Sequence, residues 1–174
     1  MSIRSFLTAL GVALLGTMAA AQSVNYDYDR AANFSTFKTY AWVRGTVLQD
    51  ELNHKRVVAA IDSQLVSKGL RRVDGEGEAD VLVAYHANFD ENVRINGFSN
   101  GVGLPRFGNV SGTATTEKIV SGTLVVDVMD ARTRSVVWRG VAGGDVDPSA
   151  KPEKREKNIS KAAEKMFKHY PPKP

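Results

Sequence analysis

The chain has 174 residues, no cysteine and a formal net charge of +4. Without cysteine it can form no disulfide, no thiolate nucleophile and no cysteine-ligated zinc site. Acidic and basic residues are interspersed, which is typical of a solvated surface and not of a nucleic-acid footprint. We therefore expect no nucleic acid among its partners.

The first 21 residues have the order of parts found in a secretory signal peptide. Arg4 is basic, residues 6–15 form an apolar run, and the small residues 19–21 follow. This run is shorter than the ~20 apolar residues that span a bilayer, so we expect cleavage and no transmembrane segment in the mature chain. We place the cut after Ala21. A lipoprotein needs a cysteine at the next position, which is Gln22, so we expect no lipid anchor.

Cleavage removes 21 of the 174 residues and one positive charge, which leaves 153 residues with a net charge of +3. That length is enough for a single domain with its own hydrophobic core, predicted over residues 22–174.

Two strands and a helix are predicted in the first half of this domain. Residues 24–29 alternate between apolar and polar, which indicates a strand with its apolar side chains inward. Residues 33–37 predict a turn, and residues 38–43 predict a second strand. The inward residues of the two strands are Val24, Tyr26 and Tyr28, then Tyr40 and Trp42.

A helix should follow, capped by Asp50 or Asn53 and ending at Lys68-Gly69, where glycine takes the left-handed position. Leu70 lies just beyond, placed to close that cap. The helical stripe consists of Leu52, Val58, Ile61 and Leu65, with Val57 beside it.

The second half predicts a central strand over residues 80–89, a long β-hairpin over residues 116–129 and 135–144, and a helix from Pro152 to Tyr170. Five glycines lie in residues 91–115, which we interpret as a Gly/Asn-rich loop or an irregular β-extension. The elements predict an α+β domain: a mostly antiparallel five- or six-stranded sheet with two amphipathic helices packed on one face.

In its segments and their order, the mature chain resembles the domain of unknown function 4136 family. The resemblance implies a bacterial envelope protein, usually a lipoprotein or a periplasmic protein, and brings no established activity or catalytic residues. Since Gln22 replaces the lipoprotein cysteine, it implies a periplasmic member without a lipid anchor. The segments are DYD (27–29), NFSTFKTYAW (33–42), AID (60–62), KGL (68–70), ADVLVAYH (79–86), GTLVVD (122–127), DART (130–133), VWRG (137–140), DP (147–148) and KR (154–155).

No nucleotide-binding, serine-hydrolase or zinc-protease motif is present. The histidines, His54, His86 and His169, are far apart, and we predict no metal site and no cofactor. His86, with Asp90 and Glu91 nearby, is the one candidate general base. The alternative, which we favour, is a strand histidine that hydrogen-bonds a neighbour.

Three further features have both a functional and a structural interpretation. Asp127 is either a carboxylate with a raised pKa or an outward residue, free or paired with Arg139, and we favour the second. The basic run over residues 151–168 could contact anionic surfaces, or it is a solvated helix face. The aromatics could line a ligand groove, but core packing is the commoner role. They are Tyr40, Trp42 and Trp138.

The sequence thus predicts no catalytic residue. The leading hypothesis is a non-enzymatic periplasmic domain that binds an envelope protein or an envelope surface. The alternative is a small-ligand binder or hydrolase with a pocket near His86 and the 91–115 segment; a chiefly structural envelope protein is a third possibility.

Overall fold

The computed structural model describes residues 23–46, 48–97 and 114–173. Six strands form one sheet in the order β1-β6-β5-β4-β2-β3. In chain order the elements are β1 (Ser23–Tyr28), β2 (Thr39–Trp42), α1 (Glu51–Ser67), β3 (Arg71–Arg72), β4 (Val81–Gly97), β5 (Ala114–Asp130), β6 (Val136–Val146) and α2 (Pro152–Phe167), with short 3-10 turns at Phe34–Thr36 and Glu76–Glu78.

The predicted α+β class is confirmed, and the sheet is mixed. β1, β6, β5 and β4 pair antiparallel, whereas β2 is parallel to both β3 and β4. The reason is that α1 lies between β2 and the next strands, and such a crossover returns the chain in the same direction.

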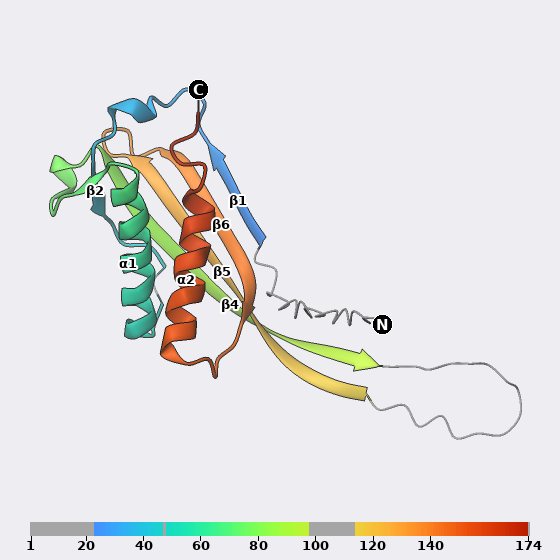
Figure 1. The fold of residues 1–174 in the computed structure, drawn as a ribbon. Helices are drawn as coiled ribbons and strands as arrows, with labels where there is room; N and C mark the ends of the chain where they lie inside the picture. Colours follow the sequence, from blue (N-terminus) through green and yellow to red (C-terminus); the bar gives the residue numbers. More distant parts are fainter. Residues whose placement is uncertain (1–22, 47, 98–113, 174) are drawn as a thin grey trace, which may run out of the picture.

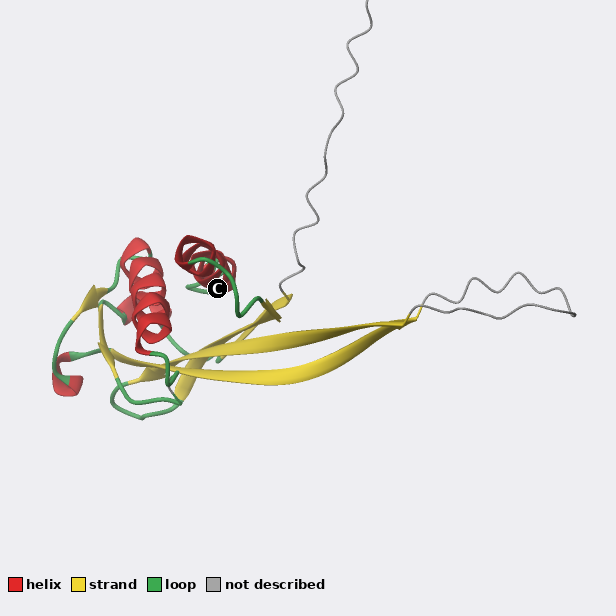
Figure 2. Ribbon diagram, turned by 90° about the horizontal axis from the view of Figure 1, so that it is seen from below, coloured by secondary structure: helices red, strands yellow, loops and turns green. Residues whose placement is uncertain are grey.

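Both helices cover the same face of the sheet, as predicted (Figures 1 and 2). The alternation of β4, β5 and β6 turns one set of side chains toward them. Trp138, Phe167 and Met166 are fully buried in this layer. At Gly140 a Cβ would lie 2.3 Å from Cγ of Met166, so the glycine lets α2 approach the sheet closely.

The ends of α1 follow the local signals. The Asp50 carboxylate accepts hydrogen bonds from the N–H groups of Leu52 and Asn53, which makes Asp50 the N-cap. At the other end Gly69 has φ +89° and Leu70 is buried. The predicted inward position of Leu52 is wrong: its side chain is 63% exposed, because the helix turns Val57 toward the core instead.

Strands β4 and β5 pair without interruption from Val81↔Asp130 to Gly97↔Ala114. Pairing of β5 with β6 ends at Val120↔Val146, so the distal parts of β4 and β5 form a two-stranded arm that leaves the body (Figure 1). Both ends of the predicted loop at 91–115 therefore have strand backbone. Residues 98–113 of that loop lie outside the described part of the chain.

Among the described strands, β1 pairs only with β6, and its inward side chains are less covered than predicted. Val24 and Tyr28 are partly buried against the core, whereas Tyr26 is 42% exposed and stacks on His169 with ring centroids 5.4 Å apart. Among the described residues, none of the helices has the length and apolar character required to cross a membrane.

Candidate functional site

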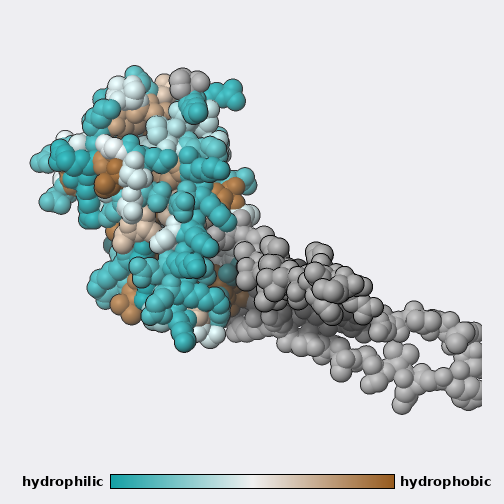
Figure 3. Space-filling view, in the orientation of Figure 1, coloured by the Kyte–Doolittle hydropathy of each residue, from teal (hydrophilic) through white to brown (hydrophobic). Residues whose placement is uncertain are grey.

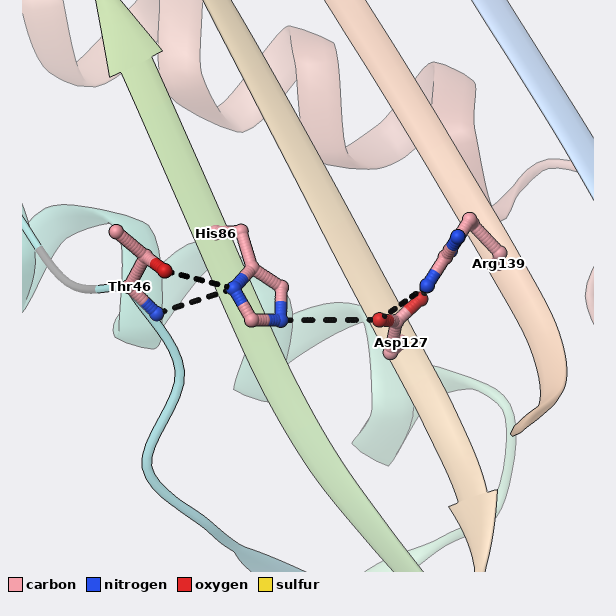
Figure 4. Close-up of polar contacts among 4 residues, drawn as sticks. All are labelled: Thr46, His86, Asp127 and Arg139. Atoms are coloured by element: carbon pink, nitrogen blue, oxygen red, sulfur yellow. Dashed lines mark hydrogen bonds and ion pairs between the residues drawn. The ribbon is translucent and has the colours of Figure 1, made fainter. Parts of the chain in front are cut away.

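His86 and Asp127 lie on the sheet face opposite the helices, in a chain of four polar side chains (Figure 4). Arg139 donates two hydrogen bonds to Asp127, at 2.6 and 2.8 Å, across the β5–β6 pair. Asp127 is only 5% exposed. Nε2 of His86 lies 3.7 Å from Oδ2 of Asp127, and Nδ1 of His86 lies 3.1 Å from both the backbone nitrogen and Oγ1 of Thr46.

This order of groups superficially matches a hydroxyl, a base and a carboxylate. In such a triad the imidazole lone pair must take the proton of the hydroxyl. Here Nδ1 of His86 accepts the backbone N–H of Thr46, and Asp127 is neutralised by Arg139, whose pKa is raised by the hydrogen bond and charge of Asp127. The geometry suits a role in fixing the segment after β2 against β4.

The other sequence candidates do not join this chain. Asp90 is hydrogen-bonded to Asn88, and the side chain of Glu91 lies outside the described residues. His54 contacts Tyr85, and His169 stacks on Tyr26. In the part of the chain that the structure describes, no group of three or more His, Asp or Glu side chains could hold a metal ion.

A larger recess lies on the helix side of the sheet. It has a volume of about 380 Å³ and lies between the N-terminal halves of α1 and α2 and strands β4, β5 and β6. We call it the interhelix groove. Its apolar lining includes Val57, Ala87, Phe89, Leu124, Ala142 and Ile159.

Two charged groups at the rim of the interhelix groove, Asp147 and Arg155, are already paired. Asp147 accepts hydrogen bonds from the Ser149 hydroxyl at 2.6 Å and from Lys154 at 3.0 Å. These partners lower its pKa to about 2. Arg155 donates to the carbonyl oxygens of Pro148 and Ala150, and so holds the chain at the start of α2. The groove therefore offers an apolar interior, with Asp147 and Arg155 paired at its rim and Asp145 beside them.

A second cavity, of about 230 Å³, lies on the other side of α1, near the β2–β3 edge of the sheet. We call it the edge pocket. Trp42 and Tyr85 meet edge to face there, with ring centroids 6.3 Å apart and an interplanar angle of 86°. Arg44 and Arg72 also line it. Trp42 was expected in the core together with Tyr40 and Trp138; those two are fully buried, whereas Trp42 is only partly buried.

One carboxylate organises the wall of the edge pocket. Oδ1 of Asp62 accepts hydrogen bonds from the Tyr40 hydroxyl at 2.7 Å and from Nε1 of Trp42 at 2.8 Å. Oδ2 accepts from Arg72 at 3.0 Å. Burial, with the Asp62 hydrogen bond, raises the pKa of Tyr40 far above its usual value, so its hydroxyl stays a donor. Asp62 lies in the AID segment of the family resemblance, yet its partners come from β2 and β3, and nothing in the sequence indicated that they meet on α1.

Together these features define an α+β fold in which a six-stranded mixed sheet carries two helices, with a cavity on each side of the first helix. The chain belongs to the DUF4136 family, a domain of unknown function, which matches residues 24–172. The resemblance seen in the sequence is thereby confirmed. None of the curated proteins matches the sequence.

Several solved structures share this fold at low sequence identity. A DUF4136 family protein from Bacteroides thetaiotaomicron has 17% identity and a TM-score of 0.56, with 86% of this chain and 96% of that chain covered. A PDZ domain protein from Parabacteroides distasonis has 15% identity and a TM-score of 0.57 over 88% of this chain, which corresponds to 37% of that protein's length. The PelC dodecamer from Paraburkholderia phytofirmans has 9% identity and a TM-score of 0.52, with 84% and 95% covered. At these identities the likeness shows the fold alone.

Proposed function

We propose that this protein is an exported, periplasmic domain without a lipid anchor, and that it acts by binding another envelope component rather than by catalysis. The signal-peptide pattern with Gln22 after the cut supports export without lipidation. The saturated contacts of His86 and Asp127 support binding over catalysis, since neither group is free to act as a base.

The interhelix groove is the observation that carries the binding proposal. A volume of about 380 Å³ lies in the range of ligand sites, and its lining is mainly apolar. The surface over the two helices is largely hydrophilic, with only scattered apolar spots (Figure 3). On this face, apolar contact is therefore available in a recess and not on a broad patch, which suits a few inserted side chains of a partner protein.

The groove also modifies the small-ligand alternative. Neither of the two cavities is lined by His86, which lies on the opposite face of the sheet. The groove does reach Phe89 and Val120, where the two-stranded arm begins. The small-ligand alternative therefore remains as a small apolar ligand bound in the interhelix groove.

Photocrosslinking from the groove tests the proposal. A photoreactive residue at Val146, which lines the groove and is 37% exposed, should crosslink to one envelope component in intact cells. Leu52 is 63% exposed and does not line the groove, so the same probe there should not. Ala162→Leu adds volume inside the groove and should abolish the Val146 product.

Two controls make the test decisive. Ala59→Leu makes the same substitution at an exposed position of α1 and should leave the Val146 product unchanged. Equal crosslinking from Val146 and Leu52, or a product insensitive to Ala162→Leu, contradicts the proposal. Export is tested separately by intact mass: the exported protein should lack residues 1–21, and a mass that includes them overturns that part.

A further inference from the structure

The edge pocket is lined by charged and aromatic residues that play no part in the proposed function. We propose that it binds the carboxylate of a small ligand whose body is aromatic or branched aliphatic. The inference rests on four properties of its lining: surplus positive charge, fixed aromatic walls, an additional hydrogen-bond donor, and a matching volume.

The surplus charge comes from two guanidinium groups and a single carboxylate. Arg72 uses one N–H in its bond to Asp62. Arg44 makes no hydrogen bond or ion pair with any other described residue. No acidic residue lines the pocket itself. Two cations against Asp62 leave one positive charge without a partner at the pocket.

The aromatic walls are held in place before any ligand arrives. Nε1 of Trp42 is bonded to Asp62 at 2.8 Å. The Tyr85 hydroxyl accepts the N–H of Leu48 at 3.2 Å and lies 2.5 Å from Nδ1 of His54. Because the rings are already fixed, binding costs little ordering of the protein.

His54 adds a donor through the same contact. Burial raises the pKa of Tyr85, so its hydroxyl keeps its proton. That hydroxyl already accepts from Leu48. We assign its own proton to the contact with Nδ1 of His54, a nitrogen whose role depends on the tautomer. In this tautomer Nε2 of His54 carries the ring proton and can donate it.

A carboxylate on a small apolar body fits these groups better than other ligands. The planar guanidinium fork matches the two oxygens of a carboxylate. A cavity of about 150 Å³ is enough for benzene, so the 230 Å³ of the edge pocket accommodates a ring with its carboxylate. A bare anion would leave the faces of Trp42 and Tyr85 uncovered, and a neutral ring would leave Arg44 unpaired.

Calorimetric titration with benzoate tests the proposal. Benzoate should bind with a dissociation constant of about 1 mM or below, as expected for a ligand of its size. Benzyl alcohol, which keeps the ring and loses the charge, should bind at least about tenfold more weakly, and so should acetate and inorganic phosphate, which lack the ring. Arg44→Gln should weaken benzoate binding about tenfold and leave benzyl alcohol unaffected.

The matched control is Arg71→Gln. Arg71 is an exposed neighbour on β3 that does not line the pocket, and its loss changes the net charge by the same amount. Equal weakening by Arg71→Gln and Arg44→Gln, benzoate binding insensitive to Arg44→Gln, or acetate and phosphate as tight as benzoate would each overturn the proposal. The indole N–H resonance of Trp42 gives a second readout: it should shift with benzoate in the wild type, and no shift at saturation also overturns it.

The proposal is independent of the interhelix groove. The neutral probe N-phenyl-1-naphthylamine should bind the groove, and Ala162→Leu should abolish that binding while benzoate binding stays intact. Failure of one proposal thus leaves the other measurable.

Discussion

The two cavities on either side of α1 differ in almost every chemical respect. The interhelix groove is apolar inside, and Asp147 and Arg155 at its rim are paired. The edge pocket has aromatic walls and an unpaired Arg44. One helix builds both, because Asn53 and Val57 line the groove while His54 and Val58 line the pocket. Residues four apart lie on the same face of a helix. The groove-lining pair and the pocket-lining pair are offset by one position, so they face different cavities.

The largest expected effect concerns the frame of the edge pocket. Asp62→Ala removes the acceptor of Tyr40, Trp42 and Arg72, and leaves a fully buried hydroxyl unpaired. We expect a loss of about 2–4 kcal/mol in the free energy of unfolding. Urea denaturation measures it. Asp74→Ala removes an exposed carboxylate and should change stability by less than about 0.5 kcal/mol; similar losses in both variants would show that the Asp62 contacts contribute little.

A second prediction concerns the close approach of the β2–α1 connection to β4. A Cβ at Gly45 would lie 2.1 Å from the backbone oxygen of Tyr85, so Gly45→Ala must displace this segment. We expect a loss of about 1–3 kcal/mol together with loss of benzoate binding. Gly77→Ala is the control, since a Cβ there meets nothing within 4 Å. Unchanged benzoate binding in Gly45→Ala would separate the pocket from this segment.

A substitution that fills the interhelix groove should not lower the free energy of unfolding as the two edge-pocket variants do. Ala162→Leu fills apolar space, so stability should stay within about 1 kcal/mol of the wild type or rise. Thermal unfolding and N-phenyl-1-naphthylamine fluorescence measure both properties. The independence of the two cavities is contradicted if Ala162→Leu also loses benzoate binding, or if Ala59→Leu has the same effect on N-phenyl-1-naphthylamine binding.

The smallest effect concerns acid stability at the groove rim. The folded-state pKa of Asp147 is about 2, below the ordinary 3.8, because Ser149 and Lys154 favour its charged form. A lowered pKa stabilises the fold above pH 3.8, and that contribution disappears as the pH falls toward 2. Asp147→Asn should therefore reduce the fall in melting temperature between these pH values. Asp145→Asn, at the same rim, controls for the loss of one negative charge; an identical pH profile for both variants contradicts the assignment.

The sequence predicted those elements whose signals are local. The Asp50 cap, the Gly69 ending and the β5–β6 hairpin are each encoded within a few residues. The pairing of Asp127 with Arg139 was also accessible, because a hairpin fixes which residues face one another. Strand order and the parallel pairing of β2 were not, since they depend on where a crossover returns the chain.

The cavities could not be found from the sequence. Trp42, His54, Arg72 and Tyr85 belong to four different elements, and nothing in their spacing indicates that they meet. The contact of His86 with Thr46 likewise joins positions 40 apart. The sequence directed attention to His86 because it is a titratable residue in a strand, whereas the hollowed regions lie on the other side of the sheet.

The pairing of β1 with β6 constrains the order in which the domain can be completed. Ser23 contacts Gly143, 120 positions further along the chain. On any route in which the N-terminus emerges first, β1 is available early but has no partner until nearly the whole domain has followed. Contacts this distant in sequence are slow to form. The outer strand is therefore the natural last step of folding, and until then Val24 and Tyr28 have no core to cover.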